Sequence, residues 1–325
     1  MTCHLLQHLI HVLMGRSRLL IIGRIGWSGD HRFRRYDLRD ATMKHIDSCP
    51  ACGADARRSE VVHVRSRDSV MRCPHCHDLF SNPRYTSAEA EALYKEYYDA
   101  EFSEAQLHWD FQENAKVLHQ TALATLRRRY PQLVKPGKRI LDYGCGLGFF
   151  LAEAQSLGLE CRGIELSEVA ARYAREKHGL HVHSGGEQAL ADEAGSTYDL
   201  VTSFAVLEHV LEPRRTLRIL IDKLKPGGVL ALTLPNLGCW RYRIEGGRWF
   251  NVNEPTHFTF YSIAGIRSVL EGMGMKDVRR VVYWGGRPGF GPQRNAVQYM
   301  ARLLNLGSEF RIVAQKQHSV QLAAA

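Results

Sequence analysis

The 325-residue sequence lacks several features that would point to a membrane or a secretory pathway. It has no apolar run of the roughly 20 residues that a membrane-spanning helix requires. It also lacks the pattern of a secretory signal peptide, because histidines interrupt the first apolar run and arginines follow it. The formal net charge of +9 is only moderate, and +4 of it lies in residues 1–42. The rest of the chain therefore needs no nucleic acid to balance its charge.

The sequence also lacks a disulfide framework, although it contains eight cysteines. Four of them form two CxxC pairs, and the others are scattered along the chain at Cys3, Cys145, Cys161 and Cys239. Small disulfide-stabilised proteins use dense and regularly spaced cysteines, which this chain does not have. A reducing, cytoplasmic location is favoured.

Residues 1–42 have no clean hydrophobic periodicity. Residues 1–29 contain no acidic residue, so an organellar targeting segment is one interpretation. Met43 directly precedes the first recognisable module, and this position favours a second interpretation. In that second interpretation, the first 42 residues are a disordered extension or the product of a mis-assigned start.

The two CxxC motifs, at residues 49–52 and 73–76, are separated by twenty residues. This spacing matches a tetrahedral zinc site with four thiolate ligands, and four thiolates leave no coordination position open for chemistry. The valine-rich stretch 61–70 between the motifs suggests a short hairpin, so we expect a structural zinc ribbon. The alternative is a pair of redox-active cysteine motifs. The expected zinc ligands are Cys49, Cys52, Cys73 and Cys76.

The stretch RILDYGCGLGFF, residues 139–150, organises the remainder of the chain. A short apolar strand leads into Gly144, Gly146 and Gly148, and the apolar residues that follow are typical of the start of a helix. A strand, a glycine turn and a helix form the opening unit of a nucleotide-binding sheet, because glycine lets a ligand lie against the backbone. The spacing differs from both the dinucleotide fingerprint and the Walker loop.

Two acidic residues indicate the chemistry of the ligand. Asp142 lies directly before the glycine turn, where a carboxylate would repel a pyrophosphate but would suit an ammonium group. Glu165 ends the next expected strand, where a carboxylate can accept hydrogen bonds from both hydroxyls of a ribose. A nucleoside with an amino-acid end and no phosphate fits both positions, and S-adenosylmethionine is such a molecule.

Four motifs make the chain resemble the class I S-adenosylmethionine-dependent methyltransferases over about residues 118–318. They are LDYGCGLG (141–148), GIELSEVA (163–170), YDLVTSFAVLEHV (198–210) and LKPGGVLALTLPN (224–236). The resemblance implies an α/β fold with a Rossmann-like seven-stranded sheet, mostly parallel with the last strand antiparallel. The domains expected are a leader (1–42), the zinc ribbon (43–80), a helical cap or linker (81–117), the methyltransferase domain (118–318) and a tail (319–325).

The resemblance also implies roles for particular residues. Phe204, at the end of the fourth strand, would line the cofactor, and Glu187 would contact the adenine amino group. Two histidines, His209 and His257, are the candidates for acid–base catalysis, and each could instead only stabilise its loop. A tyrosine-rich helix within residues 93–102 could close over the cofactor or simply pack against the catalytic domain.

The long, aromatic segment 236–260 is expected to be an irregular lid over the substrate. Some small-molecule and sugar methyltransferases carry a similar N-terminal ribbon, so we expect a small-molecule acceptor and favour oxygen as the methylated atom. One alternative is an RNA or protein methyltransferase whose ribbon docks the macromolecule. Against it, the ribbon is only mildly basic. The other alternative is a non-catalytic interaction protein. The sequence determines neither the acceptor nor the oligomeric state.

Overall fold

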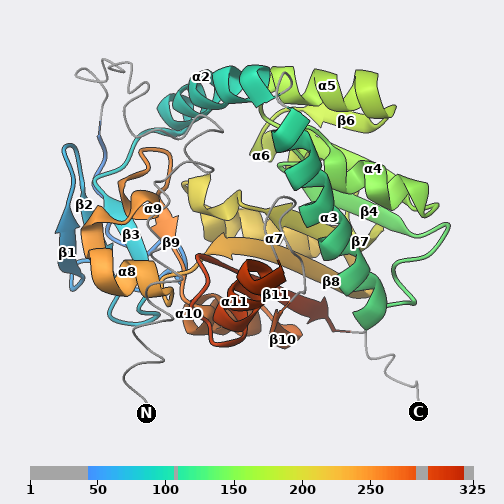
Figure 1. The fold of residues 1–325 in the computed structure, drawn as a ribbon. Coiled ribbons are helices and arrows are strands. Elements are labelled where there is room, and N and C mark those ends of the chain that lie inside the picture. The colour runs from blue at the N-terminus through green and yellow to red at the C-terminus, as the bar shows by residue number, and fades with distance from the viewer. Residues whose placement is uncertain (1–42, 106–108, 283–291, 318–325) are drawn as a thin grey trace, which may run out of the picture.

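The computed structural model describes residues 43–105, 109–282 and 292–317 (Figure 1). Its centre is a seven-stranded sheet in the order β10-β11-β8-β7-β4-β5-β6. The pairs from β6 to β8 are parallel, and β11 is antiparallel to both of its neighbours, so the expected sheet is confirmed. The strands are β4 (Arg139–Tyr143), β5 (Glu160–Glu165), β6 (His181–Ser184), β7 (Tyr198–Phe204), β8 (Leu224–Pro235), β10 (Met275–Val281) and β11 (Glu309–Lys316).

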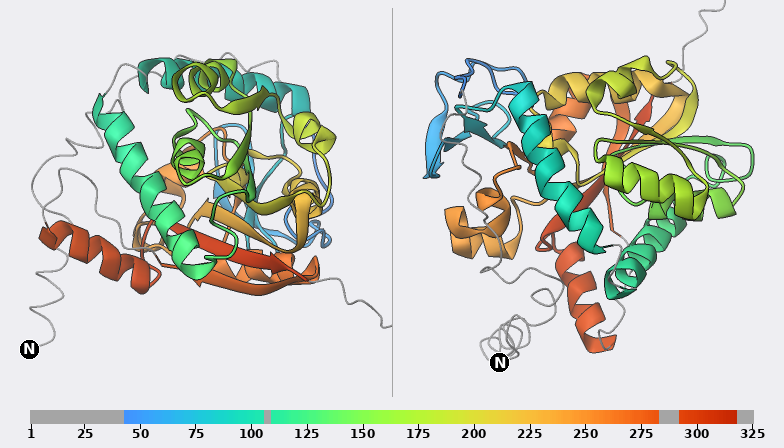
Figure 2. Two further views of the ribbon diagram at one scale, coloured as in Figure 1. Left: turned by 90° about the vertical axis from the view of Figure 1, so that its right-hand side faces the viewer. Right: turned by 90° about the horizontal axis from the view of Figure 1, so that it is seen from above.

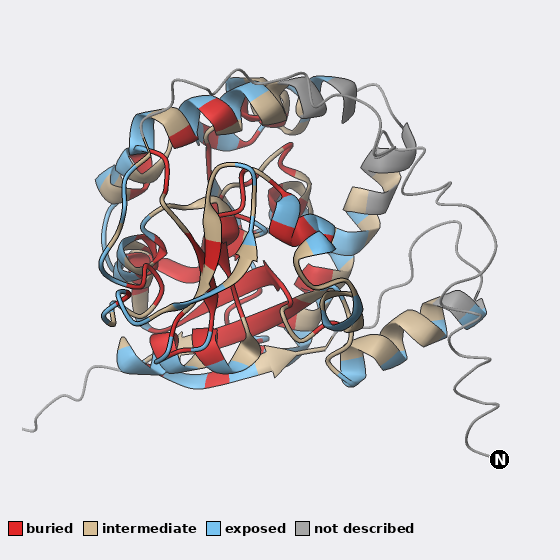
Figure 3. Cartoon of the chain, turned by 90° about the vertical axis from the view of Figure 1, so that its left-hand side faces the viewer, coloured by how far each residue is buried: buried red, intermediate tan, exposed pale blue. Residues whose placement is uncertain are grey.

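Helices cover both faces of this sheet, so the central strands are apolar on both sides. Neighbouring residues of one strand enter different hydrophobic clusters: Ile140 packs with the residues of α3 and α4, whereas Leu141 packs with those of α7 and α10. Figure 3 shows the buried residues concentrated in the strands between the helices. These helices are α3 (Trp109–Arg129), α4 (Phe149–Ser156), α5 (Glu168–His178), α6 (Glu187–Asp192), α7 (Pro213–Lys223) and α10 (Ile263–Gly272). A further helix, α11 (Pro292–Leu303), lies between β10 and β11 in the chain and projects from the sheet (Figure 2).

The cysteine module forms a second, four-stranded sheet in the order β1-β2-β3-β9. The valine-rich stretch between the CxxC motifs forms the expected antiparallel hairpin. The fourth strand comes from a distant part of the chain, since Leu79 of β3 lies opposite Phe260 of β9. The ribbon is therefore joined to the lid segment by main-chain pairing (Figure 1). The strands are β1 (Glu60–Val64), β2 (Ser69–Arg72), β3 (Leu79–Asn82) and β9 (Thr259–Phe260).

The lid segment 236–260 is more regular than the sequence analysis expected. It contains α8 (Trp240–Glu245), the 3-10 turn η3 (Gly246–Arg248) and α9 (Phe250–Asn253), so the expectation of an irregular loop is wrong there. Helices this short show no clear apolar period in a sequence. They are stabilised by a local cap, in which the Cys239 sulfur accepts a hydrogen bond from the Tyr242 amide at 3.3 Å, and by the fully buried Trp249.

The expected tyrosine-rich helix is α2 (Ser87–Ala105). It runs from the ribbon to the helices α5 and α3, which it contacts, as the right-hand view of Figure 2 shows. Among the described residues, no helix is both long and apolar enough to span a membrane. The expected leader and tail lie outside the described residues.

The turn between β4 and α4 requires glycine at its first position. Gly144 has a positive φ of 75°, and a Cβ atom added there would lie 2.2 Å from the Val206 Cγ2 methyl group. Gly137 has nearly the same φ, 76°, but has nothing within 4 Å of such an atom. Comparing an alanine substitution at Gly144 with one at Gly137 therefore separates the free-energy cost of the backbone conformation from that of the steric clash.

We predict that Gly144→Ala destabilises the protein more than Gly137→Ala does. Both substitutions meet a backbone strain of about 1–2 kcal/mol, and the clash with Val206 adds about 1–3 kcal/mol at Gly144 only. Urea denaturation followed by circular dichroism gives the two free energies of unfolding. Equal losses in the two variants would contradict the close packing of the turn against Val206.

Candidate active site

The glycine turn lies against the end of β5 at the carboxyl edge of the sheet. The Gly144 amide donates to the Ile164 carbonyl at 2.8 Å, and the Gly146 amide donates to Oε2 of Glu165 at 2.8 Å. The other carboxylate oxygen, Oε1, accepts from the Ser167 amide at 2.8 Å. Both oxygens of Glu165 are thus fixed by main-chain donors, and each keeps a lone pair for a further donor.

Glu165 is almost completely buried, at 1% exposure. Burial raises the pKa of its carboxyl group, while the amide donors act in the opposite direction. A buried carboxylate with spare acceptor capacity can bind ligand hydroxyl groups.

Asp142 lies at the end of β4 and is also buried. Its Oδ1 accepts a hydrogen bond from the Thr202 hydroxyl on the neighbouring strand β7 at 2.6 Å. Burial raises the pKa of Asp142 to about 7, the hydrogen bond from Thr202 lowers it, and the nearby Glu165 raises it. A bound cationic group would favour the ionised form of this carboxyl, because an opposite charge stabilises the charged state.

Helix α2 forms a wall beside the glycine turn. Ring carbons of Phe102 lie 3.8 Å from the position that a Cβ atom on Gly146 would occupy. One turn earlier, the Asp99 carboxylate accepts a hydrogen bond from the hydroxyl of Ser167, the residue that caps α5. The sequence analysis expected the aromatic residues of this helix but missed Asp99, because only the folded chain brings it next to Ser167.

The other two expected cofactor residues contact protein groups. The Phe204 ring packs edge-on against Phe150, with ring centroids 5.0 Å apart, and the Arg311 guanidinium lies 5.7 Å from its centroid. The Glu187 carboxylate accepts a hydrogen bond from Thr216 and pairs with Arg215 at 3.2 Å, which connects α6 to α7.

The two candidate catalytic histidines lie side by side. His209 is in the 3-10 turn η2 (Leu207–His209) after β7, and His257 precedes β9; their ring centroids are 4.6 Å apart. His209 Nδ1 lies 3.0 Å from the Thr256 carbonyl oxygen, and His257 Nδ1 lies 2.9 Å from the Asn251 carbonyl oxygen. Burial lowers the pKa of His209 to about 4 and the pKa of His257 well below its usual value.

A third polar residue, Glu208, was not singled out by the sequence analysis. Its side chain is buried, and among the described residues its Oε2 atom has no hydrogen-bond partner. Burial raises the pKa of this carboxyl to about 8. One potential ligand atom from each of Glu208, His209 and His257 lies within 4.8 Å of the others. On the α2 side, the Tyr98 hydroxyl lies 3.4 Å from Nε2 of His209.

Two arginines connect the ribbon to the segments that carry these histidines. Arg65, in the β1–β2 turn, donates to the Val252 carbonyl at 2.9 Å and to the His257 carbonyl at 3.4 Å. Arg84, after β3, donates to the Phe258 carbonyl at 3.2 Å and also to the Leu211 carbonyl. Sequence reasoning missed both residues, because an arginine that bonds distant carbonyls has no local pattern.

The four predicted zinc ligands lie together. Cys49 Sγ is 3.8 Å from Cys76 Sγ, and Cys52 Sγ is 3.7 Å from Cys73 Sγ. A tetrahedral site with Zn–S bonds of about 2.3 Å requires sulfur atoms about 3.8 Å apart. These two distances match such a site, and all four sulfur atoms lie within 4.8 Å of one another. None of the four cysteines forms a disulfide bond within the described residues.

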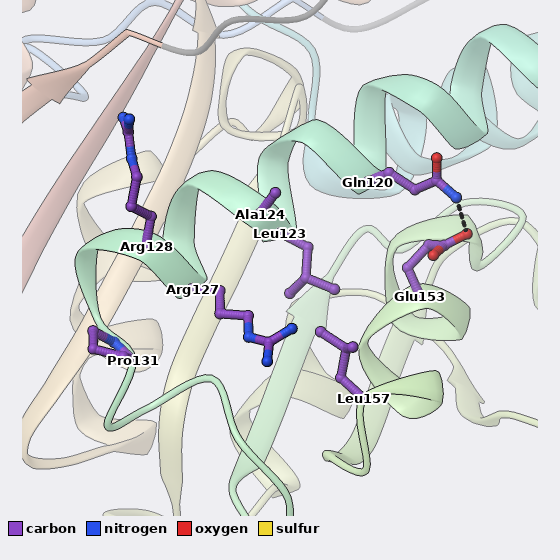
Figure 4. A pocket seen from close by; sticks show the side chains of 8 residues that line it. All are labelled: Gln120, Leu123, Ala124, Arg127, Arg128, Pro131, Glu153 and Leu157. Atoms are coloured by element: carbon purple, nitrogen blue, oxygen red, sulfur yellow. Dashed lines mark hydrogen bonds between the residues drawn. The ribbon is translucent and has the colours of Figure 1, made fainter.

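A separate groove runs between α3 and α4 (Figure 4). Leu123 and Leu157 form its floor, and the side chains of Gln120 and Glu153 are hydrogen-bonded across it at 2.9 Å. None of the predicted site residues lines this groove.

The sheet order, the glycine turn and the two buried acids beside it define the class I S-adenosylmethionine-dependent methyltransferase fold. The chain belongs to the methyltransferase-domain family, whose model, described as "Methyltransferase domain", matches residues 102–279.

Curated relatives agree with this family. The chain is 35% identical over 129 residues to a ubiquinone biosynthesis O-methyltransferase of Bordetella avium, a match that covers 37% of this chain and 52% of the relative. It is 32% identical over 162 residues to the protein of that name in Xanthomonas axonopodis pv. citri, covering 46% and 65%. The chain thus spans about half to two thirds of the length of these relatives.

A solved structure supports the fold alone. Magnesium protoporphyrin IX methyltransferase from Synechocystis PCC 6803, solved with bound SAH, has a TM-score of 0.50 and 17% sequence identity. The alignment covers 70% of this chain and 100% of that chain.

We predict that Thr202→Val raises the pKa of Asp142 above about 7, since it removes the hydrogen bond that stabilises the carboxylate. Leaving the buried carboxyl without this partner also costs about 1–3 kcal/mol of stability. Carbon-13 NMR of the Asp142 carboxyl gives the titration directly. Ser203→Ala is the control, because the Ser203 hydroxyl is buried and has no hydrogen-bond partner among the described residues. An unchanged pKa in Thr202→Val would contradict the assignment.

Proposed function

We propose that this chain transfers a methyl group from S-adenosylmethionine to a hydroxyl oxygen of a small molecule. The observation that carries the proposal is one continuous edge of the sheet. On this edge Glu165 and Asp142 lie beside the glycine turn, and His209, in the turn after the neighbouring strand β7, lies beside His257. The names of the curated relatives support both oxygen as the methylated atom and a small-molecule acceptor.

In this proposal the cofactor lies over residues 144–148. Glu165 accepts hydrogen bonds from the ribose hydroxyls, and ionised Asp142 faces the ammonium group of the methionine end. Phe204 and Glu187 line the cofactor site from β7 and α6. S-adenosylmethionine supplies a methyl group on a sulfonium centre, which a correctly aligned nucleophile can attack in line.

The acceptor lies at the histidine end of the edge. The contacts between Nδ1 and main-chain carbonyls fix both imidazole rings, because a carbonyl can only accept and the Nδ1 atom must then carry the hydrogen. Nε2 of each ring is left to act on the acceptor hydroxyl as it loses its proton. Tyr94 and Tyr98 of α2 place aromatic rings 5.6 and 5.5 Å from the His209 ring, which limits the access of water.

The cysteine cluster is proposed to hold a structural zinc ion. Its role would be to keep the ribbon folded, so that Arg65 and Arg84 hold the lid main chain in place. The pairing of β3 with β9 uses the ribbon as a support for the lid, which favours this role over the docking of RNA or protein. A reducing cytoplasm, which keeps thiolates available to zinc, is part of the proposal.

Calorimetry with S-adenosylmethionine tests the proposal. We expect micromolar binding, a loss of about 10- to 100-fold in Glu165→Ala, and no change in Glu168→Gln, whose exposed carboxylate pairs with Arg175 at 2.6 Å. Transfer of a radiolabelled methyl group to small hydroxylated acceptors follows as the activity assay. A folded protein that does not bind S-adenosylmethionine would overturn the proposed function.

Binding of S-adenosylmethionine should depend on pH through Asp142. With a pKa of about 7, the Asp142 carboxyl of the free protein is protonated below about pH 7. In that pH range, binding of a ligand that requires the ionised carboxylate is coupled to the release of a proton from Asp142. The affinity is therefore expected to fall as the pH drops below about 7 and to be constant above it. Calorimetry in two buffers of different ionisation enthalpy measures the proton release. Asp142→Asn should bind weakly and without this dependence, and an unchanged pH profile in that variant would exclude Asp142 as the source.

Purified protein should retain one zinc ion per chain after dialysis against EDTA. We expect Cys52→Ser to lose this ion and to melt at a lower temperature, because zinc binding contributes to the folding free energy of such modules. Cys239→Ser is the control, since a serine can still cap α8. Elemental analysis and thermal melts provide the readouts. Equal zinc contents in the two variants would contradict the four-thiolate site.

A further inference from the structure

The acceptor end of the site contains a second group of potential metal ligands. Among the described residues, two clusters bring at least three such side chains within 4.8 Å of one another: the four cysteines, and Glu208 with His209 and His257. The second cluster joins the turn after β7 to the segment before β9. The Phe258 amide donates to the Glu208 carbonyl at 2.8 Å, so the two segments are held together independently of the side chains.

Both imidazole rings have the orientation found in metal-binding histidines. In such sites the ring nitrogen that does not bind the metal donates to a carbonyl or a carboxylate, which fixes the tautomer and turns the other nitrogen toward the metal. Here the Nδ1 atoms lie 3.0 and 2.9 Å from the carbonyl oxygens of Thr256 and Asn251. The lone pairs therefore reside on the Nε2 atoms. Within the described part of the chain, the Tyr98 hydroxyl lies 3.4 Å from the Nε2 atom of His209, a long contact that a cation can replace.

The Glu208 carboxyl group is otherwise unexplained. It is 1% exposed, and its Oε2 atom has no hydrogen-bond partner among the described residues. A buried polar atom without a partner costs about 1–3 kcal/mol, so such an atom calls for an explanation. A bound cation would provide the missing interaction.

We propose that Glu208, His209 and His257 bind a divalent first-row transition-metal cation through one carboxylate oxygen and two imidazole nitrogens. Two histidines and one carboxylate are a recurring ligand set for such ions, and they leave coordination positions open. The four-thiolate cluster, in contrast, leaves none. The chain would thus hold one closed site in the ribbon and one open site beside the acceptor.

The role of this cation in catalysis rests on the proposed function. A hydroxyl group bound to the cation would release its proton to solvent more readily, because a Lewis acid stabilises the resulting oxyanion. The oxygen–methyl bond then forms as the sulfur–methyl bond breaks. With their Nε2 lone pairs bound to the cation, the two histidines would act on the acceptor through the cation, in place of the direct proton transfer described under the proposed function. Binding of the cation can be tested without any transfer activity.

Cobalt(II) titration of the untagged, full-length protein is the test. The protein is first dialysed against EDTA, with zinc retained in the cysteine cluster. We expect one further equivalent of cobalt to bind with visible d–d absorption and without a thiolate-to-cobalt charge-transfer band. Cobalt that exchanges into the cysteine cluster would show that band, so the spectra separate the two sites.

Glu208→Gln and His257→Gln should each weaken this second binding by about tenfold or more. His63→Gln is the matched control, because that partly buried histidine contacts the Tyr242 hydroxyl at 3.1 Å and lies outside the cluster. Thermal melts and S-adenosylmethionine binding confirm that each variant is folded. No second equivalent in the native protein, or one that persists in both ligand variants, would overturn the proposal. Failure to bind S-adenosylmethionine would instead overturn the proposed function and leave the cation result standing.

Discussion

The hydrogen bonds from the Gly146 and Ser167 amides to Glu165 are the interaction on which the site depends. They join the turn after β4 to the start of α5, so the glycine turn and the ribose-binding carboxylate are positioned as one unit. The same principle recurs at the acceptor end, where main-chain carbonyls orient both histidines. Side chains fixed by the backbone lose little additional freedom when a ligand binds, and this preorganisation favours binding and alignment.

The ribbon gives the lid a rigid support. Arg84 is 3% exposed and bonds main-chain oxygens on two segments, and burial lowers its pKa to about 10, where it is still charged at neutral pH. Together with Arg65 and the β3–β9 pairing, it connects the cysteine cluster to the segment that carries His257. A structural metal in the ribbon would therefore influence the acceptor end through these hydrogen bonds and through the packing of Val70 and Leu79 against Trp249 and Phe260.

Local patterns in the sequence predicted much of this arrangement. The strand, glycine turn and helix at residues 139–150 and the two CxxC pairs are short-range signals. The first has its expected structure, and the four cysteines of the second lie together. The features that sequence reasoning missed depend on contacts between distant segments. Glu208 is notable only because the fold leaves its carboxyl buried beside two histidines. Arg65 and Arg84 bond carbonyls of residues more than 170 positions away in the sequence. The short lid helices lack the length that would make their periodicity visible.

The most direct test of the account is a crystal structure of the protein with S-adenosylhomocysteine. The account predicts that the ribose hydroxyls contact Glu165, that the amino group lies near Asp142, and that the sulfur atom faces the space beside His209 and His257. A ligand bound in the groove between α3 and α4, or one whose sulfur points away from the histidines, would contradict the proposed active site.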